Sequence, residues 1–172
     1  SISRGKELIP IKDELRHAES YLIIQSFRYS GRFTYSFNVD KSLEDCFCNK
    51  ITIQPLIENA LYHGIADMDD GEIKITVKRA DDDPEDILIT VADNGVGMDE
   101  GTAARLFDER SARPDASSPQ GGGAGVAMHN ISERIHRFYG PHSYTRVESA
   151  PGKGTKVLLH LDLSESIFDI QE

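Results

Sequence analysis

Residues 54–64 read Gln-Pro-Leu-Ile-Glu-Asn-Ala-Leu-Tyr-His-Gly, and this stretch predicts the middle of a helix over 53–65. On such a helix Asn59 and His63 share one face, and Glu58 lies on the neighbouring face. Asparagine is a poor residue for the middle of a helix, because its side chain competes for backbone hydrogen bonds. An Asn beside a Glu, with apolar residues opposite, therefore indicates a polar edge that points into a binding site. A solvated helix face is the alternative.

Helix and strand patterns extend on both sides of this stretch. Apolar residues recur at steps of three and four over 10–29, which predicts an amphipathic helix that stops at Ser30-Gly31. Strict alternation predicts a strand over 33–39 and an antiparallel hairpin over 72–92, with an acidic turn between its strands. The remaining elements are expected to be a helix over 126–138 and two closing strands over 145–149 and 155–163. Helices and antiparallel strands interleave without the spacing of βαβ units, so the expected fold class is α+β, with helices on one face of a mixed sheet.

A second motif, Asp93-Asn-Gly95-Val-Gly97, follows the second strand of the hairpin. Asp-Asn-Gly is good turn chemistry, so a simple turn is one interpretation. The functional interpretation is that a carboxylate at the end of a strand accepts a hydrogen bond from an exocyclic amine. The glycines after it would let a flat ring approach the backbone closely.

A third motif is the glycine run 121–125. It follows a stretch from Asp108 onward that is rich in Ser, Pro, Ala, Arg and Gly, which predicts a mobile loop. A glycine-rich turn at a helix N-terminus presents free N–H groups and the positive end of the helix dipole to an anion. A flexible linker is the alternative. The run is neither a P-loop nor a dinucleotide fingerprint, because no Gly-Lys-Ser/Thr follows it and no βαβ unit surrounds it.

The net charge of the chain limits the classes of ligand that it can bind. The 172 residues hold 29 acids and 19 bases, a net charge of −10 with histidine neutral. That excess argues against a nucleic-acid surface but not against a phosphate ligand, which backbone N–H groups and a metal ion can hold locally. Nine carboxylates against three cations lie in residues 67–86, and we expect them at one edge of the domain as a solvated loop.

Cys46 and Cys48 are expected to be two small, partly buried thiols in a reducing compartment. No apolar run approaches the roughly 18 residues that a membrane helix needs, and no signal peptide opens the chain. These observations predict a cytoplasmic domain. The chain begins abruptly, in Ser-Ile-Ser-Arg-Gly, so the natural protein is expected to be longer.

Together the three motifs predict a purine nucleotide site in which Asn59 is the oxygen ligand for Mg²⁺. Their order resembles that of the GHKL ATPase superfamily, with its N box, its Asp-x-Gly-x-Gly box and its glycine lid. Within that superfamily, residues 54–64 resemble the LytS/YehU-type sensor histidine kinases, and so do residues 130–134 and 148–155. The resemblance implies a Bergerat-type two-layer sandwich over 31–172, with a mainly antiparallel sheet and a mobile ATP lid. Residues 1–30 would be the helical tail of a dimerisation and phosphoacceptor region, or a linker.

The resemblance also implies a role for each matching position. Asn59 would coordinate Mg²⁺ between the phosphates of ATP, and Glu58 would polarise the attacking nucleophile. Asp93 would accept from the adenine amine, supported by Thr155 through a water. His63 would flank the base or the ribose. The remaining ligand-binding positions would be Gly95 and Gly97 against adenine, and Gly121, Gly123, Gly125 and Val126 around the β- and γ-phosphates.

Two positions depart from the family pattern. Tyr62 stands where the family often has a cation, and Ala127 stands where it has a glycine. None of the histidines has the sequence context of a phosphoacceptor, so the chain is expected to bind ATP or ADP without phosphorylating itself.

The implied function is the ATP-binding catalytic domain of a two-component sensor histidine kinase, which passes the γ-phosphoryl group to a histidine and on to a response regulator. The intact protein would be a homodimer held at the membrane through its missing N-terminal region. Two alternatives stay open: an anti-sigma-type serine kinase, and a nucleotide-gated interaction module without phosphotransfer.

Overall fold

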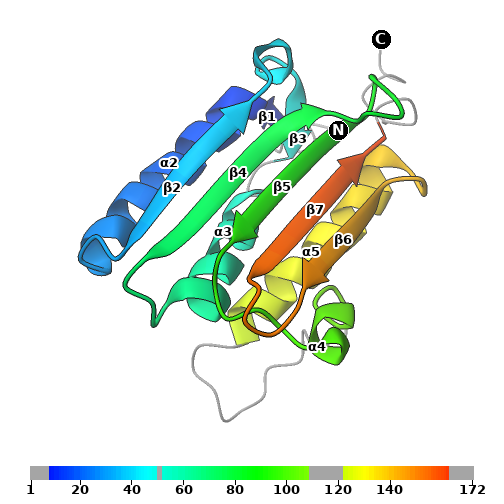
Figure 1. Cartoon of the computed structure of the whole chain (residues 1–172). Coiled ribbons are helices and arrows are strands. Elements are labelled where there is room, and N and C mark those ends of the chain that lie inside the picture. The colour runs from blue at the N-terminus through cyan, green and yellow to red at the C-terminus, as the bar shows by residue number, and fades with distance from the viewer. Residues whose placement is uncertain (1–7, 50–51, 109–121, 163–172) are drawn as a thin grey trace.

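A five-stranded sheet with helices on one face forms the body of the molecule (Figure 1). The computed structural model describes residues 8–49, 52–108 and 122–162. The strands are β2 (Phe33–Val39), β4 (Gly71–Arg79), β5 (Ile87–Asp93), β6 (Tyr144–Ser149) and β7 (Thr155–Leu161), in the spatial order β2-β4-β5-β7-β6. Only the pair β2–β4 is parallel. The α+β fold with a mixed, mainly antiparallel sheet is therefore confirmed.

Alternation along the strands decides which face the helices cover. In β4, Ile73, Ile75 and Val77 are fully buried, while Lys74 and Lys78, at alternating positions of the same strand, are exposed. Burial of every second residue is what a sheet with one covered face requires. The hairpin predicted over 72–92 is confirmed, because β4 and β5 pair antiparallel from Ile73↔Asp93 to Arg79↔Ile87.

Helix α2 (Ile11–Arg28) packs on the same core as the sheet. Its residues Ile11 and Leu22 are fully buried. The helix ends as predicted, since Ser30 and Gly31 both adopt positive φ angles, of 55° and 71°, a common way to stop a helix. The assignment of residues 1–30 to the helical tail of a dimerisation and phosphoacceptor region, or to a linker, stays a prediction.

Buried Glu14 of α2 links this helix to the next one. Its Oε1 accepts hydrogen bonds from the backbone N–H groups of Thr52 and Ile53, at 2.8 and 3.1 Å. These residues lead into α3 (Gln54–Asn59), so a carboxylate satisfies free N–H groups at the start of that helix. The short strands β1 (Leu8–Pro10) and β3 (Phe47–Asn49) pair beside it.

The burial of the two cysteines agrees with the prediction of small, partly buried thiols. Cys48 is buried in β3 and Cys46 is half-buried, and both are free thiols. Burial raises the pKa of the Cys48 thiol above its ordinary value, so it stays protonated and behaves as a small apolar side chain. A 3₁₀ turn over Lys41–Leu43 precedes these residues.

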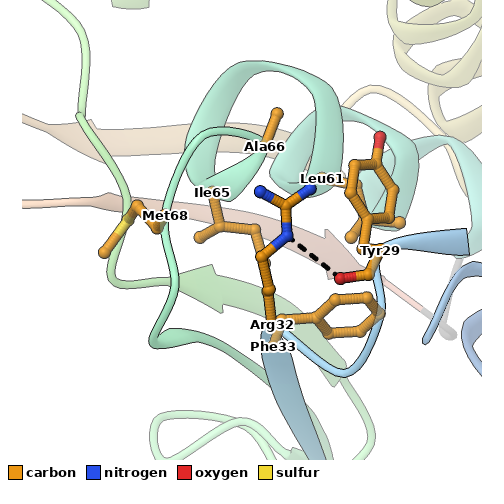
Figure 2. Close-up of a pocket in the computed structure, with 7 residues that line it drawn as sticks. All are labelled: Tyr29, Arg32, Phe33, Leu61, Ile65, Ala66 and Met68. Carbon is orange, nitrogen blue, oxygen red and sulfur yellow. Dashed lines mark hydrogen bonds between the residues drawn. The ribbon is translucent and has the colours of Figure 1, made fainter. Parts of the chain in front are cut away.

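The second helix of the core changes type at its middle. After α3 the chain continues as the π-helical segment η2 (Ala60–Ile65), where a regular α-helix over 53–65 was predicted. The end of η2 packs against the start of β2 around a narrow recess that does not admit a water molecule (Figure 2). Arg32 spans this recess, and its Nε donates to the Tyr29 carbonyl at 3.1 Å.

Two further helices complete the described chain. Helix α4 (Glu100–Ala104) was not predicted; its signal is Asp99, whose Oδ1 accepts from Thr102 N at 2.7 Å as an N-cap. Helix α5 (Gly122–Tyr139) begins four residues before the predicted start at Val126. No helix in the described part of the chain is long and apolar enough to cross a membrane.

Candidate nucleotide site

Three residues on adjacent strands form one row across the end of the sheet. The strand register pairs Ser149 of β6 with Thr155 of β7, and Thr155 with Asp93 of β5. Their side chains point to the helix-covered face, because the neighbouring pair Val91↔Val157 on that face is buried. Two predicted site residues, Asp93 and Thr155, are thus brought together, and Ser149 joins them.

Asp93 is held by backbone N–H groups. Its Oδ1 accepts from Gly95 N at 2.8 Å, and its carboxylate also accepts from the backbone of Thr155. Burial raises the pKa of Asp93, while these two hydrogen bonds act in the opposite direction. A carboxylate in this setting has its orientation fixed and retains lone pairs for another donor.

The loop after Asp93 is tied to two other segments. Val96 N donates to the Gly64 carbonyl at 3.0 Å, and the Val96 carbonyl accepts from Gly152 N at 2.6 Å. Met98 N donates to Ser149 Oγ at 2.8 Å. The end of η2, the loop after β5 and the β6–β7 turn are therefore one hydrogen-bonded unit around the carboxylate.

Two glycines make this unit possible. A Cβ on Gly95 would overlap the backbone carbonyl of Gly64, so only glycine permits the approach of the two segments. Gly97 has a φ of +71°, and a Cβ there would overlap the Ala150 carbonyl. The two glycines predicted to lie against a flat ring thus also bring three chain segments together.

Gly64 is a site residue that the sequence analysis left without a role. A Cβ at this position would lie 2.7 Å from Asp93 Oδ1, so the bare backbone of η2 passes directly over the carboxylate. The signal that could have found it is a glycine near the end of a helical pattern, where it often has a packing or functional reason.

Asn59 and His63, which were predicted to share one helix face, differ in their exposure. Asn59, the last residue of α3, is 4% exposed, whereas His63 is exposed. From Ala60 onward the segment that holds His63 is π-helical and so differs from the regular helix that was predicted. The assignments of Asn59 to metal and of His63 to base or ribose stay predictions.

Glu58 lies beside α2. Gln54 Nε2 donates to its Oε1 at 3.1 Å. Burial raises the pKa of the Tyr21 hydroxyl on α2, and the charge of Glu58 adds to that rise, which places the carboxylate near this tyrosine. The hydrogen bond of Glu58 to Gln54 lies within α3, and the catalytic role of Glu58 remains a prediction.

The first turns of α5 contain most of the predicted phosphate-binding residues. Gly123, Gly125 and Val126 lie inside the helix and not in a turn before it. Gly121 lies outside the described residues, as does most of the predicted lid. Further along the helix, His129 Nδ1 lies 3.3 Å from the Phe107 carbonyl, which connects α5 to the segment after α4.

The acidic residues do not gather at one edge, and that expectation was wrong. The turn after β4 holds one group, but the group over 67–72 lies at the other end of the strand, next to the site. Asn94, directly after Asp93, donates from Nδ2 to the Asp70 carbonyl and accepts from Glu72 N. The reason is that the strand between the two groups is fully extended and carries them to opposite ends of the sheet.

Comparison with known proteins identifies the family. Residues 49–165 match the family of histidine kinase-, DNA gyrase B- and HSP90-like ATPases, and the chain belongs to this family. It is 31% identical over 160 residues to the sensor histidine kinase YesM of Bacillus subtilis, and 30% identical over 158 residues to the sensor protein LytS of the same organism. Each match covers 92% of this chain and 25% of the relative, so the chain spans about a quarter of the length of these proteins.

Solved structures agree on the fold. The mycobacterial sensor histidine kinase MprB superposes with a TM-score of 0.63 at 15% identity, covering 90% of this chain and 95% of the MprB chain. Membership of an ATPase family assigns ATP as the ligand of the domain. The fold, the GHKL recognition and the ATP ligand expected from the sequence are confirmed.

Proposed function

We propose that this chain is the catalytic domain of a sensor histidine kinase, which binds Mg-ATP and transfers its γ-phosphoryl group to a histidine outside the chain. The observation that carries the proposal is the carboxylate of Asp93, fixed by backbone N–H groups beneath the bare backbone of Gly64. The similarity to YesM, a sensor histidine kinase, supports a histidine kinase over the serine-kinase alternative.

Adenine would be recognised by the residues in one row at the ends of β5 and β7, Asp93 and Thr155. A carboxylate with free lone pairs accepts from an exocyclic amine, and the glycine backbone beside it lets a planar base lie close. His63, exposed on η2, would flank the base or the ribose. The net charge of −10 and the carboxylates over 67–72 oppose a polyphosphate, so binding must rest on such short-range contacts.

The phosphate end would use Asn59 and the start of α5. The described residues contain no cluster of three or more His, Cys, Asp or Glu side chains that could hold a metal. Mg²⁺ in nucleotide sites needs few protein ligands, because phosphates and waters supply the rest, and an amide oxygen is one of its ordinary ligands. Asn59 fits that requirement, and the ion would neutralise phosphate charge. Gly121, Gly123, Gly125 and Val126 would offer backbone N–H groups to the β- and γ-phosphates.

In the proposed transfer, the bond from the γ-phosphorus to the oxygen of the β-phosphate breaks and a bond to an imidazole nitrogen forms. ADP leaves, and Glu58 would take up the imidazole proton if the acceptor approached from its side. Phosphoryl transfer depends mainly on positioning and charge stabilisation, which this domain would supply. The response regulator, the homodimer and the membrane attachment of the intact protein, with this domain on the cytoplasmic side, belong to the same proposal.

The test is phosphotransfer in trans. The chain is mixed with γ-labelled ATP, Mg²⁺ and the histidine-containing segment of the intact protein, and the label is followed on both. We expect acid-labile label on the added segment and none on the chain alone. Binding of ATP without label on the segment would leave a nucleotide-gated module as the function, and acid-stable label would support the serine kinase.

The metal assignment has its own test. Calorimetric titration of ATP with and without Mg²⁺ should show a metal-dependent gain in affinity for the wild type and a smaller gain for Asn59→Ala. A matched control is Asn130→Ala, on α5. If Asn59→Ala keeps the full gain, Asn59 is not the ligand.

A further inference from the structure

The Ser149 hydroxyl makes three contacts that together decide the direction of its hydrogen bonds. Ser149 Oγ lies 2.8 Å from Met98 N, 2.9 Å from the Gly154 carbonyl and 2.8 Å from Thr155 Oγ1. A hydroxyl has one proton to donate and two lone pairs to accept with. A backbone N–H can only donate and a carbonyl can only accept.

The first two contacts therefore assign the third. The proton of Ser149 goes to the Gly154 carbonyl, and one lone pair accepts from Met98 N–H. The lone pair that remains can only accept, so Thr155 must donate its own proton to Ser149. Thr155 Oγ1 is left with lone pairs alone for any other partner.

The direction of the Thr155 hydrogen bond affects what Thr155 and its other neighbour, Asp93, can offer a ligand together. Asp93 is paired with Thr155 in the sheet register and presents a carboxylate on the same face. With the Thr155 proton committed to Ser149, both groups offer acceptors. A pair of acceptors favours a ligand that brings a donor, such as the 6-amino group of adenine, and opposes one that brings the 6-oxo group of guanine or hypoxanthine.

We propose that Ser149 is a positioning residue that sets the hydrogen-bond polarity of Thr155 and thereby contributes to the choice of a 6-amino over a 6-oxo purine nucleotide. The inference rests on the proposed function of the site in binding ATP. Thr155 is 6% exposed and Ser149 is half-buried, so water competes little for these hydroxyls.

Removal of Ser149 should have two separable effects. Ser149→Ala takes an acceptor from Met98 and a donor from Gly154, which loosens the loop and weakens both nucleotides by a similar factor. It also frees the Thr155 proton, which can then turn toward a 6-oxo group. Only the second effect changes the ratio of the affinity for a 6-amino nucleotide to the affinity for a 6-oxo nucleotide. This ratio therefore separates a positioning role of Ser149 from a merely structural one.

The experiment measures the affinities of ATP and inosine triphosphate, which differ at the 6-position, by calorimetry with Mg²⁺. We expect the wild type to prefer ATP, and Ser149→Ala to reduce that preference about tenfold, the size of one hydrogen bond. Ser149→Thr keeps a hydroxyl and should restore the preference. The control Thr145→Ala removes a β6 hydroxyl from the same face away from the site, and should leave the ratio unchanged.

The Thr155→Val variant tests whether Ser149 acts through the Thr155 hydroxyl. In Thr155→Val, which lacks the hydroxyl, Ser149→Ala should not change the ratio further. The proposal is overturned if the ratio of ATP affinity to inosine triphosphate affinity is the same in Ser149→Ala as in the wild type. It is also overturned if Ser149→Ala lowers this ratio further in the Thr155→Val variant. A wild type that binds neither nucleotide would instead overturn the proposed function, and one that binds both equally would overturn the inference alone.

Discussion

Strand β5 has a shielded aspartate at each end, and the two are held in different ways. Asp86, just before the strand, is 8% exposed and lies 2.7 Å from His160 Nε2. Asp93, at the other end, is held by the backbone N–H groups of Gly95 and Thr155. The imidazole pairs with Asp86 Oδ2 inside the protein and leaves Oδ1 buried without a hydrogen-bond partner among the described residues, whereas the Asp93 carboxylate lies beside bare glycine backbone. We assign the first arrangement to stability, and the proposed function assigns the second to a ligand.

The largest expected effect is on stability at the Asp86 end. His160→Phe keeps an aromatic ring stacked on Tyr144, whose ring lies 4.7 Å from that of His160, but removes the partner of a buried carboxylate. We expect a loss of about 3 kcal/mol in the free energy of unfolding, measured with denaturant. The double variant His160→Phe, Asp86→Leu should recover much of the loss; if it does not, loss of the His160–Asp86 hydrogen bond is not the cause.

The next prediction tests whether the bare glycine backbone beside Asp93 is needed for ATP binding. Gly95→Ala places a methyl group where the Gly64 carbonyl lies, so η2 and the loop must separate. We expect a loss of at least tenfold in ATP affinity and about 1–3 kcal/mol in stability. Gly101→Ala, in a helix with no close obstruction, is the control and should change neither quantity appreciably. Full ATP affinity in Gly95→Ala would show that the close approach is unnecessary.

Glu14 sharpens the comparison, since it too is a buried carboxylate that accepts from two backbone N–H groups. Its partners lead into α3, so it should act as a helix cap and not as a ligand site. We expect Glu14→Gln to cost about 1–2 kcal/mol of unfolding free energy and to leave ATP affinity within twofold. A large loss of affinity without a loss of stability would contradict this distinction.

The smallest expected effect is a dependence on pH. Burial raises the native pKa of Asp93, so its ionised form costs stability at neutral pH and the cost is relieved as pH falls through that raised pKa. Relative to Asp93→Asn, the wild type should therefore gain stability on acidification from above the ordinary aspartate range. Denaturant titrations of both proteins from pH 7 to pH 4 check this. An opposite slope would mean that the backbone hydrogen bonds outweigh burial.

Local patterns were sufficient for most of the fold. The alternation in β4 and β5 and the stop at Ser30-Gly31 depend on neighbouring residues only, so these elements and the position of Asp93 could be predicted. The family motif added Thr155 and the nucleotide. These predictions succeed because one-sided burial imposes a period of two on the sequence.

Long-range contacts account for what was missed. The π-helical segment coincides with the place where the Gly64 carbonyl accepts from Val96 N, more than thirty residues away. Ser149 enters the site only through the register of β6 on β7. Neither effect has a local periodic signal. The acidic residues were misplaced because their distance along an extended strand was overlooked.

The comparison between the two aspartates is tested most directly by titrating ATP into Asp93→Asn and Asp86→Asn under the same conditions. Both replacements remove one charge and keep the size of the side chain. We predict that Asp93→Asn loses about 100-fold in ATP affinity, the value of a charge-assisted hydrogen bond, while Asp86→Asn stays within threefold of the wild type. Unchanged affinity in Asp93→Asn, or an equal loss in both, would contradict the assignment of Asp93 to the ligand.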